Sequence, residues 1–109
     1  MAATYKVLGQ SAPSATTNTD VYTVPSATST VVSTITVCNR SASAVTYRIA
    51  VRPAGAAIAN QHYIAYEIAL AANDTTALTL GVSLATTDVV TVYASTDNLT
   101  FNIFGSEIV

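Results

Sequence analysis

The chain has 109 residues, of which 50% are hydrophobic and only 9% are charged, and its formal net charge is −2. This length suits one domain that can bury its own core, but ordinary soluble domains have roughly 25% charged residues. Four basic residues against six acidic ones disfavour nucleic-acid binding, which normally needs a basic surface. Apolar runs are too short for a transmembrane helix, and the first ten residues lack the apolar segment of a signal peptide. We therefore expect neither a nucleic-acid nor a membrane partner, and we expect other subunits to cover much of the weakly charged surface.

Residues 1–20 differ in composition from the rest of the chain. The segment GQSAPSATTNTD is small, polar and aperiodic, and it follows the short strand-like sequence YKVL. A mobile terminus is one interpretation. The other is an extended N-terminal arm in which YKVLGQ, through Val7 and Leu8, pairs with the sheet edge of another chain. We divide the chain into an arm over residues 1–20 and a domain over residues 21–109.

From Asp20 onward, β-branched residues, period-two alternation and turn signals dominate. In STVVSTITVCN (29–39), strict alternation places Ile35 and Val37 on the same face as Val31 and Ser33. In HYIAYEIALA (62–71), we expect Ile64, Tyr66, Ile68 and Leu70 to point inward, although this window also fits a helix. The other expected inward sets are Val45, Tyr47, Ile49 and Val51; Leu78, Leu80, Val82 and Leu84; and Leu99, Phe101 and Ile103.

The spacing of these strands indicates the fold class. Short strands that recur about every 8 to 12 residues, with turn residues between them, are typical of a sandwich or a barrel. We predict an all-β fold, a single-domain antiparallel β-sandwich of jelly-roll or Ig-like type, with seven to eight strands and an extended N-terminal arm.

No residue pattern in the chain is typical of an active site. One His, His62, and one Cys, Cys38, are too few for a zinc site, and no G-x-S-x-G motif is present. Asp74, Asp88 and Asp97 lie in predicted turns, where Asp side chains bind the backbone. We expect a protein that is not an enzyme, with no catalytic residue, cofactor or metal.

Three Asn-x-Ser/Thr triplets begin at Asn39, Asn73 and Asn98. Such triplets arise by chance in a chain this rich in Ser and Thr. Because no signal peptide is recognised, we do not expect them to be glycosylated.

Three of the four basic residues, Arg40, Arg48 and Arg52, lie within residues 35–55. Arg48 and Arg52 share one face of a predicted strand, and Arg40 lies in the preceding turn. One interpretation is that they bind another subunit, because Arg is enriched at interfaces. The other is that Arg48 or Arg52 pairs with Glu67 on the next strand.

Three aromatic residues, Tyr63, Tyr93 and Phe104, are predicted to point away from the core. An exposed aromatic ring is the platform on which a sugar stacks, so these residues are candidates for a glycan site. Tyr is also enriched in subunit interfaces, which is the alternative.

The segments YTVPS, VVSTITVCNR, TYRIAVRPAG and FNIFGSEI, in this order, resemble small structural proteins of tailed phages, including cyanobacterial phages. The resemblance covers about residues 6–108 and carries over no functional residue. It implies a non-enzymatic virion component made in the host cytoplasm. We expect a homo-oligomer, such as a trimer, that decorates or cements the capsid through contacts with its own copies and with other virion proteins, such as the major capsid protein or tail proteins. The alternatives are a tail, neck, baseplate or fibre component, or a receptor- or glycan-binding module.

Overall fold

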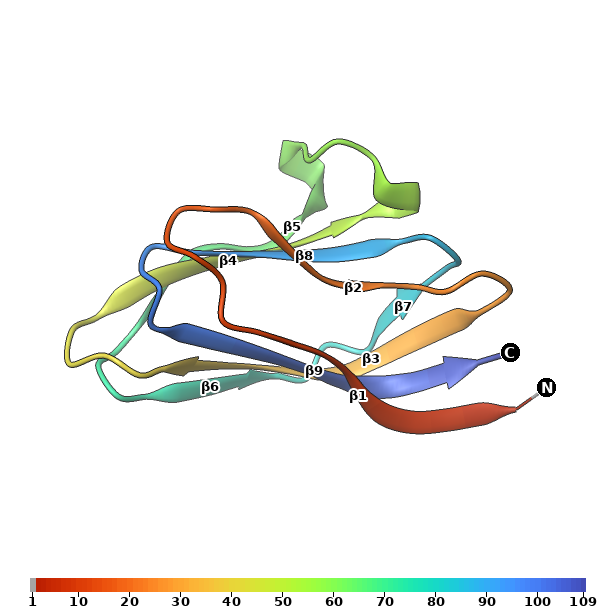
Figure 1. The fold of residues 1–109 in the computed structure, drawn as a ribbon, viewed down its shortest axis with the longest axis horizontal. Helices are drawn as coiled ribbons and strands as arrows, with labels where there is room; N and C mark the ends of the chain where they lie inside the picture. The colour runs from red at the N-terminus through yellow and green to blue at the C-terminus, as the bar shows by residue number, and fades with distance from the viewer. Residues whose placement is uncertain (1) are drawn as a thin grey trace.

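The computed structural model describes residues 2–109, which form two antiparallel sheets packed face to face (Figure 1). The first sheet has the order β1-β9-β3-β6, with β7 also paired to β3, and the second has the order β2-β8-β4-β5. This arrangement confirms the predicted all-β sandwich. The strands are β1 (Ala3–Ser11), β2 (Thr19–Thr23), β3 (Ser29–Asn39), β4 (Val45–Arg52), β5 (Tyr63–Leu70), β6 (Thr75–Leu78), β7 (Val82–Leu84), β8 (Val89–Ala94) and β9 (Leu99–Ile108). Two short 3-10 turns, η1 (Pro53–Gly55) and η2 (Asn60–His62), lie between β4 and β5.

The core lies between the two sheets and consists of the inward-facing side chains of both. Alternation correctly predicted the buried residues of β9 and the burial of Val45, Tyr47 and Ile49 in β4. In β4, however, Val51 is only partly buried, and Ala50, which is outside the predicted inward set, is buried. The rings of Tyr47 and Phe101 meet edge to face across the sandwich, with 6.2 Å between their centroids. Burial of each such side chain stabilises the fold by about 1.5–3 kcal/mol. The largest fully buried residues are Tyr47, Phe101, Ile35, Ile49, Leu99 and Ile103.

The N-terminal segment belongs to the first sheet. β1 pairs with β9 of the same chain, from Ala3 opposite Ile108 to Ser11 opposite Phe101. Because β9 has ten residues, it offers the nine residues of β1 a partner of matching length. The other edge of β1 has no partner strand among the described residues, so the expected pairing of YKVLGQ with the sheet edge of another chain stays a prediction. Residues 12–18 then connect the first sheet to the second.

Two β-bulges lie side by side across the first sheet. In β3 the extra residue is Ser33, between Val32 and Thr34, and in β1 it is Leu8, between Val7 and Gly9. Both bulges lie opposite the same part of β9. β6 and β7 separate at this same level of β3. We call this row of irregularities the bulge line.

The bulge line reverses the inward and outward faces of β3. One extra residue moves every later side chain to the other face of the strand. Val32, Ile35 and Val37 are therefore all buried, whereas Val31 is 36% exposed. The expectation that Val31 and Ser33 share a face with Ile35 and Val37 is wrong for this reason.

The expected inward face of residues 62–71 is also wrong in part. Only Leu70 of the predicted inward set is buried. The register with β4 shifts on both sides of Ile49, and Glu67 has a positive φ of 50°. β5 is also an edge strand, so that one flank of it has no neighbouring strand among the described residues. The exposed fractions are 42% for Ile64, 54% for Tyr66 and 43% for Ile68.

The predicted strand over residues 76–85 is two strands in the structure. The chain leaves the sheet after Leu78 and returns at Val82, and Gly81 between them has a φ of 65°. Leu84 is buried, but Leu80 is 52% exposed and does not join the other three residues. This division and the inclusion of β1 raise the number of strands above the seven or eight expected.

Candidate functional site

The outer face of β1, β9, β3 and β6 carries no charged side chain among the described residues, and we call it the neutral face. Cross-strand pairing defines its rows, because directly opposite residues point to the same side of a sheet. One row holds Tyr5, Ser106 and Val31, and the next holds Val7, Phe104 and Thr34. A third row holds Gln10, Asn102, Thr36 and Ala77, and Thr100, Cys38 and Thr75 form the fourth.

The charged residues of β1 and β9 point to the opposite side of their sheet. Lys6 lies opposite Gly105, and Glu107 lies opposite Thr30. Each of the two charged residues is next in sequence to a residue of the Tyr5 row, so its side chain points to the other side of the sheet. Lys6 Nζ and Glu107 Oε1 form an ion pair at 2.8 Å. The two charges therefore neutralise each other away from the neutral face.

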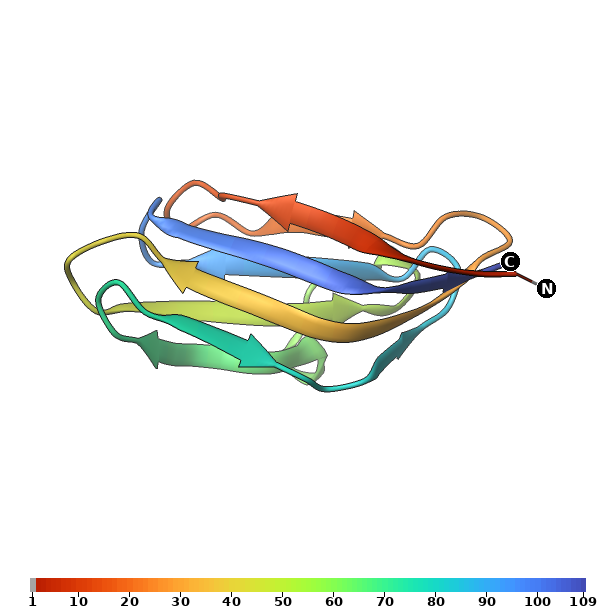
Figure 2. The same cartoon turned by 90° about the horizontal axis from the view of Figure 1, so that it is seen from below.

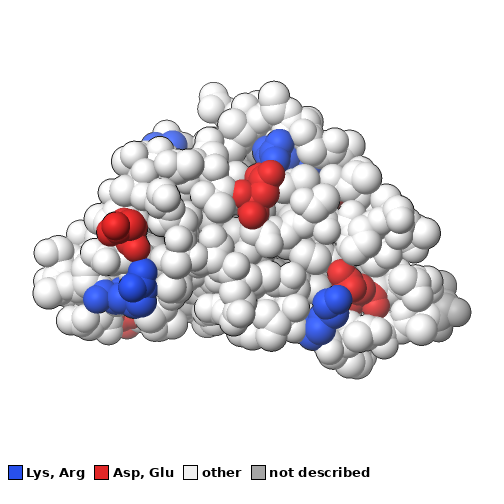
Figure 3. Space-filling view, in the orientation of Figure 1, with Lys and Arg blue, Asp and Glu red and all other residues white. Residues whose placement is uncertain are grey.

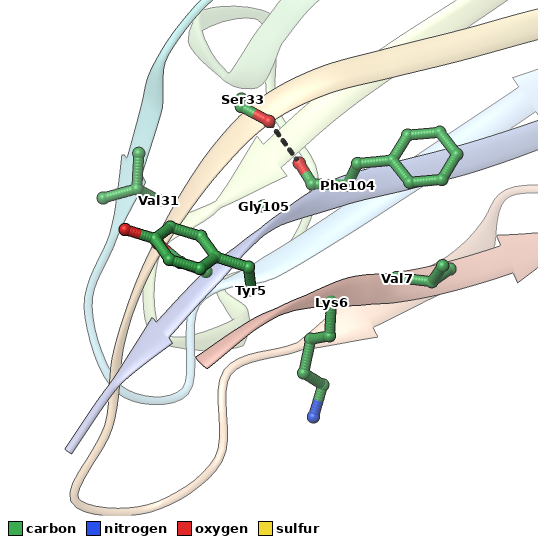
Figure 4. Close-up of a pocket in the computed structure, with 8 residues that line it drawn as sticks. Tyr5, Lys6, Val7, Val31, Ser33, Phe104 and Gly105 are labelled. Atoms are coloured by element: carbon green, nitrogen blue, oxygen red, sulfur yellow. Dashed lines mark hydrogen bonds between the residues drawn. The ribbon is translucent and has the colours of Figure 1, made fainter. Parts of the chain in front are cut away.

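A shallow groove of about 580 Å³ lies on the neutral face where the bulge line crosses it (Figure 4). The Ser33 hydroxyl donates a 3.2 Å hydrogen bond to the carbonyl oxygen of Phe104, which joins β3 to β9 inside the groove. Tyr5 is 84% exposed and Val7 is 47% exposed. Two predicted interface residues, Val7 and Phe104, therefore meet in one mainly apolar groove, whereas Leu8 packs against the core. Lys6 also lines this groove at the β1 edge, where its amine is paired with Glu107.

The outer face of the second sheet holds a different cluster, formed by Arg48, Tyr63, Tyr66, Glu67 and Tyr93. The guanidinium carbon of Arg48 lies 4.6 Å from the ring centroid of Tyr66 and 4.1 Å from that of Tyr93. Arg48 Nη2 also donates a 3.0 Å hydrogen bond to Glu67 Oε1, which raises the pKa of Arg48 and lowers that of Glu67. The Tyr63 ring meets the Tyr66 ring edge to face, with 4.9 Å between centroids. We call these five residues the tyrosine–arginine cluster.

Sequence reasoning found most of this cluster but missed Tyr66. It named Arg48, Tyr63 and Tyr93, and it offered Glu67 as an internal partner of Arg48, which the structure shows. Tyr66 was assigned to the core because strict alternation ignores the positive φ at Glu67. No sequence signal marks that bulge.

Arg52 and Arg40 also bind within the chain. Arg52 donates hydrogen bonds to Thr91 Oγ1, to the carbonyl oxygens of Gly55 and Ala56, and to Asp20 Oδ1, at 2.9–3.0 Å. Arg40 donates one, to the carbonyl oxygen of Asp97 at 3.0 Å. Figure 3 shows the charged side chains of this view as small separate groups on a mostly uncharged surface.

The single His and the single Cys have ordinary surroundings. His62 Nδ1 accepts a 3.0 Å hydrogen bond from the backbone N–H of Ala59 and so holds the turn η2. Cys38 is partly exposed on the neutral face. Within residues 2–109, no group of three or more His, Cys, Asp or Glu side chains is placed to hold a metal ion.

The same described residues contain no helix with the length and apolar character needed to cross a membrane. Comparison with protein-family models, with curated proteins and with solved structures finds no match to this chain.

Proposed function

We propose that this protein is a non-enzymatic structural subunit that assembles with its own copies and with other virion proteins through the neutral face, as a decoration or cement protein of a phage capsid. The neutral face is the observation that carries the proposal. Interface centres are depleted in charge and enriched in aromatic side chains, and this face has Tyr5 and Phe104 but no charge among the described residues. The sequence resemblance supports the assignment to a phage particle.

The chemistry of the neutral face suits a surface that is covered by protein. Burying a charge requires a partner that replaces its hydration, whereas Thr, Ser, Asn and Gln need only hydrogen bonds. Gln10 and Asn102 already bond to each other at 2.7 Å, so this row is ordered before any partner arrives. Tyr5, Val7 and Val31 add apolar area, which contributes about 25 cal/mol for each Å² removed from water.

The test uses purified protein and phage particles that lack it. The parent chain should bind the particles and restore their resistance to heat or osmotic shock. Val31→Lys places a charge on the neutral face at a residue that is 36% exposed, so we expect it to fold but to lose binding. The matched control is Ile64→Lys on β5 of the second sheet, where the side chain is 42% exposed.

This test distinguishes a wrong function from a wrong assembly surface. A parent chain that does not bind the particles would contradict the proposed function. Binding that survives Val31→Lys but is lost in Ile64→Lys would move the assembly surface to the second sheet. Imaging a label attached after Val109 would distinguish the capsid from the tail, neck, baseplate or fibres.

A second candidate function, a receptor- or glycan-binding module, is favoured by one observation. Tyr63 and Tyr66 line a depression of about 470 Å³ together with Asn60, which can supply hydrogen bonds to a sugar. Arg48 contacts the Tyr66 ring, so the platform is ordered without ligand. Tyr66→Ala should then abolish glycan-array signals and host adsorption, and an array without signals would exclude this function.

A further inference from the structure

The N-terminal half of β1 is an unpaired sheet edge among the described residues. β1 is the outermost strand of its sheet, and Figure 2 shows it at the margin of the sandwich. Gly9 lies against Val21 of β2, where a β-carbon on Gly9 would come within 2.4 Å of the Val21 carbonyl oxygen. β2 therefore packs against the inner face of the later part of β1, whereas residues 3–7 have no strand beside their outer edge among the described residues. All five of these residues are exposed.

The hydrogen bonds at the chain ends show which backbone groups of β1 are free. Ala2 and Val109 exchange both of their backbone hydrogen bonds, at 3.2 and 3.0 Å. In an antiparallel pair, such bonded pairs alternate with pairs that make no bonds to each other. Thr4 and Lys6 are therefore bonded to β9, whereas the N–H and C=O groups of Ala3, Tyr5 and Val7 point away from it.

We propose that two copies of this chain join through these free edges, with β1 of each copy antiparallel to β1 of the other and Tyr5 on the two-fold axis. In this register Ala3 lies opposite Val7 of the partner copy, and Tyr5 lies opposite its own equivalent. Each of these three pairs exchanges two hydrogen bonds, about six in all. The two five-stranded sheets become one continuous sheet, and their neutral faces join. The proposal rests on the self-association proposed above, but it places the contact between two copies at the β1 edge and leaves the joined neutral face for other partners. It does not rest on binding to a phage particle.

The side chains favour a second copy as the occupant and favour this register. Charged edge residues, especially Lys, normally prevent such pairing, but Lys6 is held in an ion pair with Glu107. The Tyr5 register places Lys6 opposite Thr4 of the partner copy. A shift that paired Tyr5 with Val7 would place the two Lys6 residues opposite each other, and like charges in that position destabilise a sheet. The Tyr5 register also uses all three free residues of each chain.

Disulfide trapping tests the register. In a Cys38→Ser background, Tyr5→Cys places two thiols in a bonded cross-strand pair, with Cα atoms about 5.5 Å apart, which suits a disulfide. Thr4→Cys is the matched control, because Thr4 would lie about 8 Å from its equivalent, too far for a bridge. We expect mild oxidation to give covalent dimers of Tyr5→Cys and not of Thr4→Cys. Equal cross-linking of the two variants, or none of Tyr5→Cys, would overturn the proposal.

A proline variant tests the backbone pairing in the otherwise intact chain. Tyr5→Pro removes an N–H that faces the free edge, so pairing with β9 should persist, whereas Tyr5→Ala removes the same ring but keeps the N–H. We expect sedimentation to show a dimer for the parent and for Tyr5→Ala, and about a hundredfold weaker association for Tyr5→Pro. Thermal unfolding of dilute samples should give similar midpoints for both variants.

These experiments also distinguish failure of the edge pairing from failure of the proposed capsid role. A parent chain that stays monomeric at all concentrations, or a dimer that Tyr5→Pro leaves intact, would overturn the edge pairing. Particle binding by monomeric Tyr5→Pro would show that the capsid role holds without the dimer. A stable parent dimer that fails to bind particles would instead contradict the capsid role and leave the edge pairing standing.

Discussion

The hydroxyl of Tyr22 donates a 2.6 Å hydrogen bond to Glu107 Oε2, and this bond joins β2 of one sheet to β9 of the other. The same hydroxyl lies 2.8 Å from Thr30 Oγ1, and Glu107 also accepts a hydrogen bond from Lys6. Burial and the bond to Glu107 raise the pKa of Tyr22 to about 12. The bonds from Lys6 and Tyr22 lower the pKa of Glu107. A polar link therefore fastens the two sheets together beside the free edge of β1.

We expect stability to fall at alkaline pH because of Tyr22. Above pH 10 the unfolded chain loses the Tyr22 proton, whereas the folded chain keeps it up to about pH 12. The unfolded state then binds fewer protons than the folded state, so the free energy of unfolding decreases as pH rises. Tyr22→Phe should make this decrease shallower, as measured by urea unfolding at a series of pH values. The pKa of Tyr47 is also raised by its burial, so part of the decrease should remain.

Tyr5→Phe is the control for this experiment, because Tyr5 is 84% exposed. It should leave the pH dependence unchanged. At neutral pH, Tyr22→Phe should lower the free energy of unfolding by about 1–2 kcal/mol through the lost hydrogen bonds. If Tyr22→Phe leaves the alkaline decrease in the free energy of unfolding unchanged, Tyr22 is not its cause.

Gly105→Ala should destabilise the first sheet. A β-carbon on Gly105 would come within 2.1 Å of the Val31 carbonyl oxygen, so β3 and β9 would have to move apart. Overpacking of this kind costs about 1–3 kcal/mol or more. Gly81→Ala is the control, because a β-carbon there meets nothing within 4 Å and only the φ of 65° is unfavourable, at about 1 kcal/mol. If denaturant unfolding shows equal losses, Gly105 does not set the spacing of β3 and β9.

Asn39→Ala should be among the most destabilising substitutions outside the apolar core. Asn39 is 1% exposed, and its amide donates hydrogen bonds to the carbonyl oxygens of Ser43 at 2.8 Å and Ala71 at 3.0 Å. Its side-chain oxygen accepts a 2.9 Å bond from the N–H of Ser41. Alanine would leave these groups unpaired, and we expect a loss of about 3 kcal/mol by denaturant unfolding.

Asn98→Ala is the matched control for Asn39. The hydrogen bonds of Asn98 involve its backbone, so its loss should stay within about 0.5 kcal/mol. A similar effect of the two substitutions would show that the Asn39 bonds contribute little. The burial of Asn39 also means that its side chain is not accessible for glycosylation in the folded chain.

Arg52→Ala should lower stability more than Arg40→Ala, although each removes one positive charge. Arg52 binds Asp20, Thr91 and two carbonyl oxygens, and so holds η1 and the residue after it against β2 and β8. We expect a loss of about 1–3 kcal/mol for Arg52. Arg40 is exposed and makes one such bond, so its loss should be below about 1 kcal/mol. Thermal or urea unfolding of the two variants measures the difference, and equal losses would contradict it.

Regular alternation was enough to predict the fold class and the strands β4 and β9. In β4, Val45, Tyr47 and Ile49 are buried as expected, because β4 lies between β8 and β5. Alternation failed wherever the backbone departs from ideal strand geometry. A bulge adds one residue without changing composition, so nothing in the sequence marks Ser33 as the extra residue of β3.

The candidate surfaces could be predicted only in part, because they depend on contacts between distant residues. Low charge predicts a surface covered by other subunits, which stays a prediction, and only the pairing of β1 with β9 shows that Tyr5 and Phe104 lie on the same face. Likewise, Arg48 and Tyr93 could be named as exposed, but their contact with Tyr66 depends on the conformation of Glu67. Non-local pairing of this kind leaves no local signal in the chain.

The bulge line also determines how this sequence can be varied. Along β3 the buried positions are Thr30, Val32, Ile35, Val37 and Asn39, so the interval between them is two, then three, then two and again two residues. The exposed positions that tolerate polar substitutions should therefore alternate in one register before Ser33 and in the other register after it. A combinatorial library designed on a strict two-residue repeat would place polar side chains in the core over half of this strand, and most of its members would not fold.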